Sequence, residues 1–312
     1  MTGDDTTEAP LDPPAVVEVA DDVFAFVQPD GTWFVNNAGF VVGDDHVVLI
    51  DTCATERRTR ALLEAVAATT DSPVRVVVNT HHHGDHTHGN FLCGDATIVG
   101  HQRCREEVER MGILTLDSVW GAVDWGDLQL RPPDLTFTDG IDLSVGDLTL
   151  EVRAFGSAAH TTNDVVVWVP ERRVLFTGDL VFHGGTPFVV MGSIAGSLAS
   201  LDWLRSFAPD VIVPGHGPVC DVGALDAIED YLRFVADLAE RGRADGIAPL
   251  ALAEATDLGR FAGLTDPERL VANLHRAYAE AEGTPPGDPI DYLTAFSDML
   301  ALNGGGPLRC LA

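Results

Sequence analysis

The sequence predicts an α/β protein that ends in a helical extension. Over residues 15–228, short apolar runs of strand length alternate with segments in which apolar residues recur at helical spacing. Four of the apolar runs lead into an Asp or a His, and α/β sheets gather their ligands at the carboxyl ends of strands. From about residue 229 the pattern is helical throughout. We therefore expect one α/β domain, with residues 229–312 packed on it as an appendage.

The first elements along the chain are expected to be antiparallel strands followed by a helix. Residues 1–14 are rich in Thr, Asp and Pro, which predicts a disordered acidic tail. Apolar runs joined by Asp and Gly turns predict strands at residues 16–19, 23–27 and 33–42. The apolar positions of residues 55–68 recur at helical spacing and predict a helix.

The rest of the domain continues this mixture of strands and helices. The further elements that we expect are strands at residues 148–154 and 164–169 and helices at residues 102–111, 197–207 and 224–240. Residues 112–135 show no periodicity and are expected to form an irregular insertion.

Four further strands are informative because each leads into an ionisable side chain. The runs and the residues that follow them are 47–50 with Asp51, 74–78 with His81, 174–176 with Asp179, and 211–213 with His216. Potential ligands at four strand ends predict one site that is assembled from two halves of the chain.

Composition excludes several classes of function. The 312 residues include 48 acidic and 19 basic residues, every basic residue is Arg, and the formal net charge is −29 at pH 7. The absence of lysine excludes a Schiff-base lysine and a Walker-type phosphate lysine. The negative charge argues against binding to nucleic acid and to anionic membrane surfaces.

Cysteine usage and the N-terminal segment predict a cytoplasmic protein. The 5 cysteines are odd in number and form no Cys-x-x-Cys pair, which favours reduced thiols. No segment approaches the roughly 18 apolar residues of a membrane span. The acidic start of the chain lacks the basic and apolar regions of a secretory signal.

A histidine-rich motif after the second informative strand predicts a metal site. Residues 80–90 contain His81, His83, Asp85 and His86 in the pattern His-x-His-x-Asp-His. Imidazole nitrogens and carboxylate oxygens are the usual zinc ligands where cysteine is absent. The loop can offer its first two histidines to one ion and Asp85 with His86 to a second ion.

Distant residues must complete both sets of ligands. The candidates are His160, Asp179 and His216, and a carboxylate such as Asp179 can bridge two ions. A chance histidine tract or a metal-binding protein without activity is the competing interpretation. The three distant ligands favour a catalytic site.

These residues resemble the metallo-β-lactamase superfamily over about residues 15–220. The resemblance implies a four-layer αββα sandwich and a dinuclear centre, with two zinc ions per chain. The implied ligands are His81, His83 and His160 for the first ion and Asp85, His86 and His216 for the second, with Asp179 bridging. Asp51 is implied to orient a ligand histidine. The chain has His at position 83 where the flavodiiron branch has Glu, which favours zinc over iron.

Several segments outside the motif are similar to the actinorhodin-type second-ring cyclases of aromatic polyketide pathways. These segments are residues 123–126, 130–133, 186–188, 192–196 and 270–276. The resemblance implies an intramolecular aldol condensation and hydrolysis of the thioester to an acyl carrier protein. Side chains expected to line a pocket for the polyketide are Trp120, Trp125, Phe182, Phe188 and Met191.

Arginine clusters offer docking sites for an acidic carrier protein. Arg57, Arg58 and Arg60 form one cluster, and Arg103, Arg105 and Arg110 form a second. A solvated helix face that alternates Arg with Glu is the competing interpretation for each cluster.

Catalytic roles are expected for Asp85, Asp179 and His183. His183 lies four residues after Asp179, so it is a candidate for proton transfer, with a simple loop role as the alternative. The alternative functions are a thioesterase, lactonase or glyoxalase II-like hydrolase and a mononuclear-iron persulfide dioxygenase. The oligomeric state, including a homodimer, stays open, as do the exact polyketide and the order of cyclisation and release.

Overall fold

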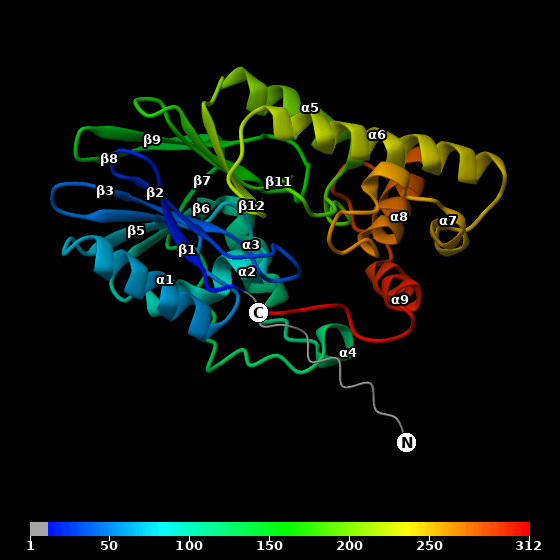
Figure 1. The fold of residues 1–312 in the computed structure, drawn as a ribbon, viewed down its shortest axis with the longest axis horizontal. Coiled ribbons are helices and arrows are strands. Elements are labelled where there is room, and N and C mark those ends of the chain that lie inside the picture. Colours follow the sequence, from blue (N-terminus) through cyan, green and yellow to red (C-terminus); the bar gives the residue numbers. More distant parts are fainter. Residues whose placement is uncertain (1–11) are drawn as a thin grey trace.

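The computed structural model describes residues 12–312 and contains two β-sheets that face each other (Figure 1). Most of the predicted acidic tail therefore lies outside the described residues. The first sheet has the order β1-β2-β3-β4-β5-β6-β7 and the second has the order β12-β11-β10-β9-β8. The pairs β4–β5, β5–β6, β6–β7 and β11–β12 are parallel, and the other neighbours are antiparallel.

The strands of both sheets have the following bounds. The first sheet contains β1 (Ala15–Ala20), β2 (Val23–Val27), β3 (Ala38–Val42), β4 (Val47–Ile50), β5 (Val74–Val78), β6 (Thr97–His101) and β7 (Leu135–Phe137). The second sheet contains β8 (Gly140–Val145), β9 (Leu148–Ala154), β10 (Val165–Val169), β11 (Val174–Phe182) and β12 (Val211–His216).

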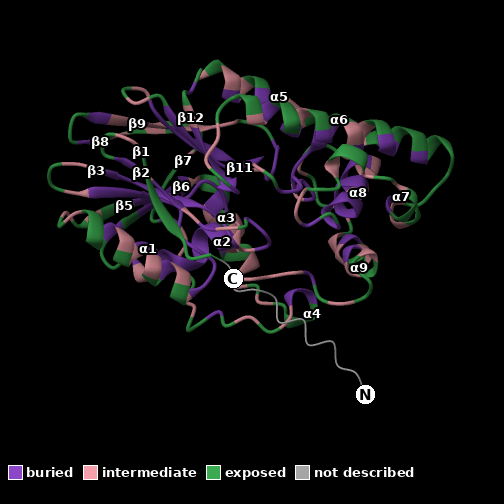
Figure 2. Cartoon of the chain, viewed as in Figure 1, coloured by how far each residue is buried: buried purple, intermediate pink, exposed green. Residues whose placement is uncertain are grey.

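Alternation along the strands explains why helices cover both sheets. In β4, Val48 and Ile50 join the core between the sheets, whereas Val47 and Leu49 pack on the opposite face with Leu62 of α1 (Glu56–Thr69). Successive strand residues point to opposite faces, so a continuous apolar strand needs a cover on each side. Figure 2 shows buried residues along the inner strands of both sheets, whereas the edge strand β1 is largely exposed.

The helices form the outer layers of the sandwich. The first sheet carries α1 and α3 (Gln102–Met111), and the second carries α5 (Ile194–Ser206) and α6 (Gly223–Ala244) (Figure 1). The predicted four-layer αββα sandwich is thereby confirmed. Short elements at the edge between the sheets are α2 (Gly84–Thr87) and the 3-10 helix η1 (His88–Leu92), whereas α4 (Asp117–Trp120) lies in the predicted insertion and its Trp120 ring packs on Phe296 near the C-terminus.

Two predicted segments differ from the structure, and some strands were not predicted. Residues 33–37 form a loop instead of the start of a strand, because the buried Asn36 and Asn37 side chains hydrogen-bond to the backbone of other segments. The strand predicted at 174–176 continues to Phe182, so Asp179 lies within β11. Strands β6, β7 and β8 were not predicted. Strand β6 is a short run with three buried residues, and the alternating exposed residues of β7 and β8 carry a weak apolar signal.

The C-terminal part is helical, as predicted. It contains the end of α6, then α7 (Pro249–Ala255), the 3-10 helix η2 (Gly259–Phe261), α8 (Arg269–Ala281) and α9 (Tyr292–Leu302). Helix α6 extends beyond the sheets, α8 packs under it, and α9 packs on α8 (Figure 1). No helix among residues 12–312 is long and apolar enough to cross a membrane.

Candidate metal centre

The motif residues lie at one edge of the sandwich, between the two sheets. The first sheet supplies the loop after β5, which carries His81 and His83, and α2, which carries Asp85 and His86. The second sheet supplies the remaining three candidates. His160 lies in the turn between β9 and β10, Asp179 lies in β11, and His216 is the last residue of β12.

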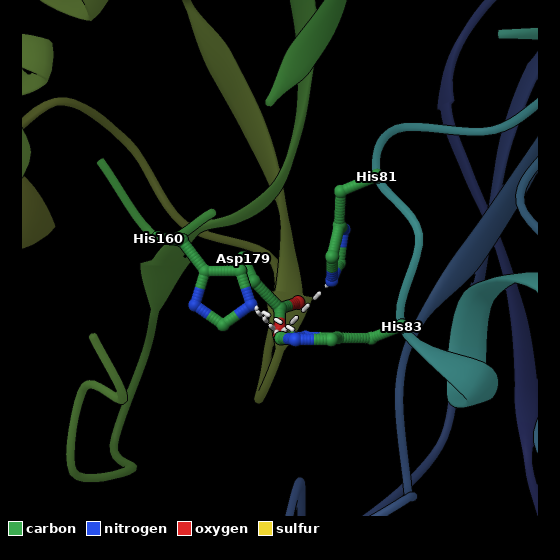
Figure 3. A group of neighbouring side chains, drawn as sticks. All are labelled: His81, His83, His160 and Asp179. Carbon is green, nitrogen blue, oxygen red and sulfur yellow. Dashed lines mark hydrogen bonds and ion pairs between the residues drawn. The ribbon is translucent and has the colours of Figure 1, made fainter. Parts of the chain in front are cut away.

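His81, His83 and His160 converge on the Asp179 carboxylate (Figure 3). The Nε2 atom of His160 lies 2.9 Å from Nδ1 of His83 and 3.3 Å from Oδ2 of Asp179. The Nε2 atom of His81 lies 3.9 Å from the same carboxylate oxygen. One ligand atom from each of the four residues falls within 4.8 Å of the others.

Asp179 also belongs to a second group, together with Asp85, His86 and His216. The Nε2 atom of His216 lies 3.1 Å from Oδ2 of Asp85 and 3.4 Å from Oδ2 of Asp179. The Nε2 atom of His86 lies 3.1 Å from Oδ1 of Asp179 and 3.6 Å from Oδ2 of Asp85. The two predicted ligand sets therefore come together around one shared carboxylate.

Close backbone approach makes room for that carboxylate. Gly215 precedes His216 in β12, and a Cβ atom at this position would clash with Oδ1 of Asp179. A glycine is thus required where the two parallel strands β11 and β12 carry adjacent ligands.

Unpartnered buried atoms show that the two groups fit metal ions. His81 Nε2 is buried and has no hydrogen-bond partner among residues 12–312, and the buried atoms His86 Nε2 and Asp179 Oδ1 lie 3.1 Å apart without hydrogen-bond geometry. An unsatisfied buried polar atom costs about 1–3 kcal/mol, and a cation coordinated by these atoms would remove that penalty. Nitrogen and oxygen donors in sets of three or four suit zinc.

Outer hydrogen bonds fix the tautomers of three histidines. The Nδ1 atom of His86 donates to Oδ2 of Asp51 at 2.8 Å, that of His160 to the Phe188 carbonyl at 2.5 Å, and that of His216 to the Gly31 carbonyl at 3.0 Å. Because these acceptors engage Nδ1 of each ring, Nε2 is the nitrogen that faces the centre and binds a metal once any proton on it has been displaced.

Asp51 occupies the position that the resemblance implies. Its carboxylate accepts a hydrogen bond from the His86 ring and two more from the amide and the hydroxyl of Thr80, both at 2.7 Å. Burial nevertheless raises the pKa of Asp51, against the opposing effect of His86. Asp51 thereby links the end of β4 to the metal-binding loop after β5.

The charged groups of the cluster shift one another's pKa values. Burial opposes the imidazolium form of His216, but the carboxylates of Asp179 and Asp85 outweigh it and raise the pKa of His216 to about 9. Burial likewise opposes the charge on His86, and three carboxylates raise its pKa well above the usual value. Burial and the neighbouring rings lower the pKa values of His81 and His83.

A cavity of about 640 Å³ opens above the ligand cluster. Ligand residues at its floor are His83, Asp85, His160, Asp179 and His216. Four of the predicted pocket residues line it, namely Trp120, Phe182, Phe188 and Met191. The predicted lining residue Trp125 does not, because its ring packs behind Phe34, with the two ring centroids 4.9 Å apart.

Further lining residues come from segments that the sequence analysis did not assign to the pocket. They include Trp33 and Phe34 before β3, Met111 at the end of α3, Leu114 and Leu116 in the insertion, and Tyr292, Leu293 and Phe296 of α9. An aromatic pair at helical spacing in α9 was the available signal. That signal does not show that the appendage folds back over the metal centre.

The structure places His183 away from the cavity wall. Its Nδ1 atom lies 2.9 Å from the Pro218 carbonyl oxygen, and His183 is not a lining residue of the cavity. We therefore assign it no step in the mechanism proposed below.

The first arginine cluster is largely engaged by other groups. Arg58 donates to Oε1 of Gln28 at 2.6 Å and to the Leu311 carbonyl, and Arg60 pairs with Glu56 at 2.6 Å. Arg57 is exposed. In the second cluster, Arg105 pairs with Glu109 and Arg110 pairs with Glu107. Docking of a carrier protein at either cluster stays a prediction.

The family model of the metallo-beta-lactamase superfamily matches residues 31–216, and the chain belongs to this superfamily. Its relatives include hydrolases. The chain is 24% identical over 299 residues to a linear primary-alkylsulfatase of a Pseudomonas species, covering 78% of this chain and 55% of that protein. It is 25% identical to a metallo-beta-lactamase type 2 of Bacteroides fragilis, covering 71% and 85% of the two chains.

A hydroxyacylglutathione hydrolase of Rhodospirillum rubrum is 28% identical, over 56% of this chain and 63% of that enzyme. The chain spans about half the length of the first curated relatives that it matches. Among solved structures, a metallo-beta-lactamase from Pontibacter korlensis superposes with a TM-score of 0.60 at 22% identity, over 71% of this chain and 99% of that one. That likeness confirms the fold.

Proposed function

We propose that the protein is a two-metal hydrolase of an ester or thioester with a large apolar acyl group. The observation that carries this proposal is the position of both ligand groups at the floor of a cavity of about 640 Å³ with mostly apolar walls. Ligand pockets of about 300–1,000 Å³ suit molecules of drug size, so a small acyl group would leave most of the cavity unfilled.

The relatives support the reaction class. An alkylsulfatase, a β-lactamase and a hydroxyacylglutathione hydrolase are named for the hydrolysis of different bonds. The superfamily scaffold thus serves hydrolysis of several substrates, and the cavity walls above the metal centre are expected to select among them.

Zinc ions held by the two groups would polarise a carbonyl oxygen and activate a water molecule near neutral pH. Asp179 holds the two sets of ligands together, because its carboxylate belongs to both. Asp51 and the carbonyls of Phe188 and Gly31 keep three imidazoles turned with Nε2 towards the centre. The mostly apolar walls would give a bound scissile group a less polar environment than water and thereby strengthen electrostatic interactions with it.

A substrate panel tests this function. Purified protein is loaded with zinc and given aryl, long-chain and acetyl thioesters, and the matching oxygen esters. We expect a higher kcat/KM for the bulky acyl groups than for acetyl, and loss of all turnover after chelation. A preference for acetyl substrates, or unchanged turnover without metal, would contradict the proposal. One bound iron and no zinc in the protein as purified, before zinc is added, would instead favour the persulfide dioxygenase alternative.

A polyketide cyclase with thioesterase activity is the second candidate, because aromatic rings line the cavity. Trp33 packs edge-to-face on Phe188, with centroids 4.9 Å apart, and Trp120 and Phe296 extend the same wall. A first-ring-closed polyketide tethered to an acyl carrier protein distinguishes the candidates. A released bicyclic product supports the cyclase, whereas release of an uncyclised acid supports the hydrolase alone.

A further inference from the structure

One face of helix α8 carries three polar side chains in the protein interior. Arg269, Asn273 and Arg276 are 1%, 0% and 0% exposed, and their spacing of four and three residues places them on one side of the helix. All three donate to backbone carbonyls of one short segment, which spans residues 186–190. Long polar side chains are rarely buried without a specific partner, so this face has a defined structural task.

Asn273 holds the backbone on both sides of Phe188. Its Nδ2 atom donates to the Pro187 carbonyl at 2.7 Å, and its Oδ1 atom accepts from the Val189 amide at 3.0 Å. The Phe188 carbonyl between them accepts the hydrogen bond from Nδ1 of His160 at 2.5 Å. The Asn273 amide therefore sets the direction of the acceptor that orients one ligand of the first group.

The turn before α8 acts on the second group through another loop. Oδ1 of Asp266 accepts from the Thr32 hydroxyl at 2.5 Å, and Oδ2 lies 2.8 Å from the guanidinium of Arg269. Thr32 follows Gly31, whose carbonyl accepts from Nδ1 of His216 at 3.0 Å.

Gly31 is tightly confined at this position. Its φ is +82°, and a Cβ atom would lie 2.7 Å from the nitrogen of Gly217. The guanidinium of Arg269 also lies 4.1 Å from the centre of the Trp33 ring. The loop that orients His216 is thus fixed between the end of β12 and the start of α8.

We propose that α8 and the preceding Asp266 are the outer positioning element of the metal centre, with Asn273 serving His160 and Asp266 serving His216. This inference rests on the proposed metal binding. A released carbonyl no longer fixes the imidazole, and loss of such an outer partner lowers metal affinity by about tenfold to a hundredfold. The contacts through Asn273 and those through Asp266 are separate, so loss of either one is expected to affect the binding of one ion.

Two substitutions test these two sets of contacts separately. Thr32→Val removes the hydroxyl that donates a hydrogen bond to Asp266. It keeps the shape of the side chain and the buried Asp266–Arg269 pair. Asn273→Leu removes both hydrogen bonds around Phe188 at similar volume. Thr32→Ser restores the hydroxyl and is the conservative rescue variant. His275→Gln is the matched control, because His275 lies on the same helix but pairs with Asp298 of α9 at 2.7 Å.

The measurement is zinc affinity of each site by competition with a chromophoric chelator. The His81→Ala background retains the second group, and the His86→Ala background retains the first. We expect Thr32→Val to weaken zinc binding about tenfold to a hundredfold in the His81→Ala background, which retains the second group. In the His86→Ala background, which retains the first group, Thr32→Val should leave zinc binding unchanged. Asn273→Leu should do the reverse, while Thr32→Ser and His275→Gln should match the parent.

Equal weakening of both sites by either variant, or no weakening of the site that the variant serves, would overturn the proposal. Circular dichroism establishes that each variant is folded, and Asn273→Ser replaces Asn273→Leu if the latter is not. Zinc-loaded wild type without esterase or thioesterase activity would refute the proposed function but not this inference. Wild type that binds no zinc would refute both.

Discussion

Asp179 is the residue on which both ligand groups depend. It lies in the middle of β11 with 7% of its surface exposed, and its two oxygens face histidines from both sheets. Burial opposes its charge, but His216, His86 and His160 lower the pKa of Asp179 well below the usual range, so the carboxylate is ionised at neutral pH. Replacing Asp179 by Asn, which is neutral and has the same shape, isolates the effect of that charge.

We expect Asp179→Asn to lose at least about tenfold to a hundredfold in affinity for both zinc ions, with turnover falling accordingly. Elemental analysis after dialysis measures the metal content, and circular dichroism follows the fold. Asp164→Asn is the comparison, since Asp164 is a buried carboxylate outside both ligand groups. It accepts hydrogen bonds from Thr161, the neighbour of His160, so we expect a smaller loss of metal than in Asp179→Asn. Full metal content in Asp179→Asn would show that the assignment of the shared ligand is wrong.

Metal uptake should also depend on pH through His216. Its pKa of about 9 means that the imidazole is protonated near neutral pH in protein from which metal has been removed. Zinc requires the neutral ring, so binding below pH 9 must release this proton, and affinity should rise by about tenfold per pH unit for each proton displaced. The expected sign is stronger binding at pH 8 than at pH 6.

Proton release is measured by titrating zinc into weakly buffered protein that contains a pH indicator. Acidification with each equivalent of zinc is the expected result. Zinc affinity that is independent of pH between about 6 and 8 would contradict the raised pKa.

The residues of the metal motif could be predicted from the sequence because their signal is local. Four ligands occur within six positions, and His216 ends an apolar strand. The outer partners of His160 and His216 could not be predicted. They are backbone carbonyls of Phe188 and Gly31, which every residue possesses, so no residue type marks them.

At the scale of elements, the periodicity of apolar residues predicted the positions of most helices and strands in the sequence. It did not predict which part of the molecule each of them packs on. The predicted bounds 102–111 and 148–154 agree with α3 and β9, where the apolar pattern is strong. The C-terminal helices were predicted as helices, yet the contribution of α9 to the cavity depends on how α8 packs under α6. Such placement arises from long-range packing that a local pattern does not encode.

The insertion before β7 provides a matched pair of tryptophans for testing the cavity wall. Trp120 and Trp125 are each 8% exposed, and both pack edge-to-face on Phe34, at 4.8 and 4.9 Å between centroids. Only Trp120 of this pair lines the cavity. Trp120→Phe should therefore raise KM for a bulky aryl thioester, whereas Trp125→Phe should leave KM unchanged.

Both substitutions remove similar buried area, so we expect similar losses of stability, about 1–3 kcal/mol each. Steady-state kinetics gives KM, and chemical denaturation gives the free energy of unfolding. An equal change of KM in both variants would show that Trp120→Phe acts on KM through Phe34 and not through lost contact with the substrate.

At the scale of the whole molecule, the metal centre connects the two sheets. His81, His83, Asp85 and His86 follow a strand of the first sheet, whereas His160, Asp179 and His216 belong to the second. The core between the sheets is otherwise held by apolar contacts, and the chain carries a formal net charge of −29. Bound cations would therefore link the halves and reduce the repulsion among buried carboxylates.

We expect removal of metal to destabilise the whole fold. A ligand that binds only the folded state at a thousandfold excess over its Kd contributes about 4 kcal/mol, and each kcal/mol corresponds to about 2–4 °C in Tm for a domain of 150–250 residues. Calorimetry with zinc and with excess chelator measures the difference, which should be about ten degrees. Sodium chloride added to the chelated protein is the control, because screening relieves general repulsion without restoring coordination. An unchanged Tm on chelation would mean that the sheets are held without metal, and recovery of Tm by salt alone would assign the effect to net charge.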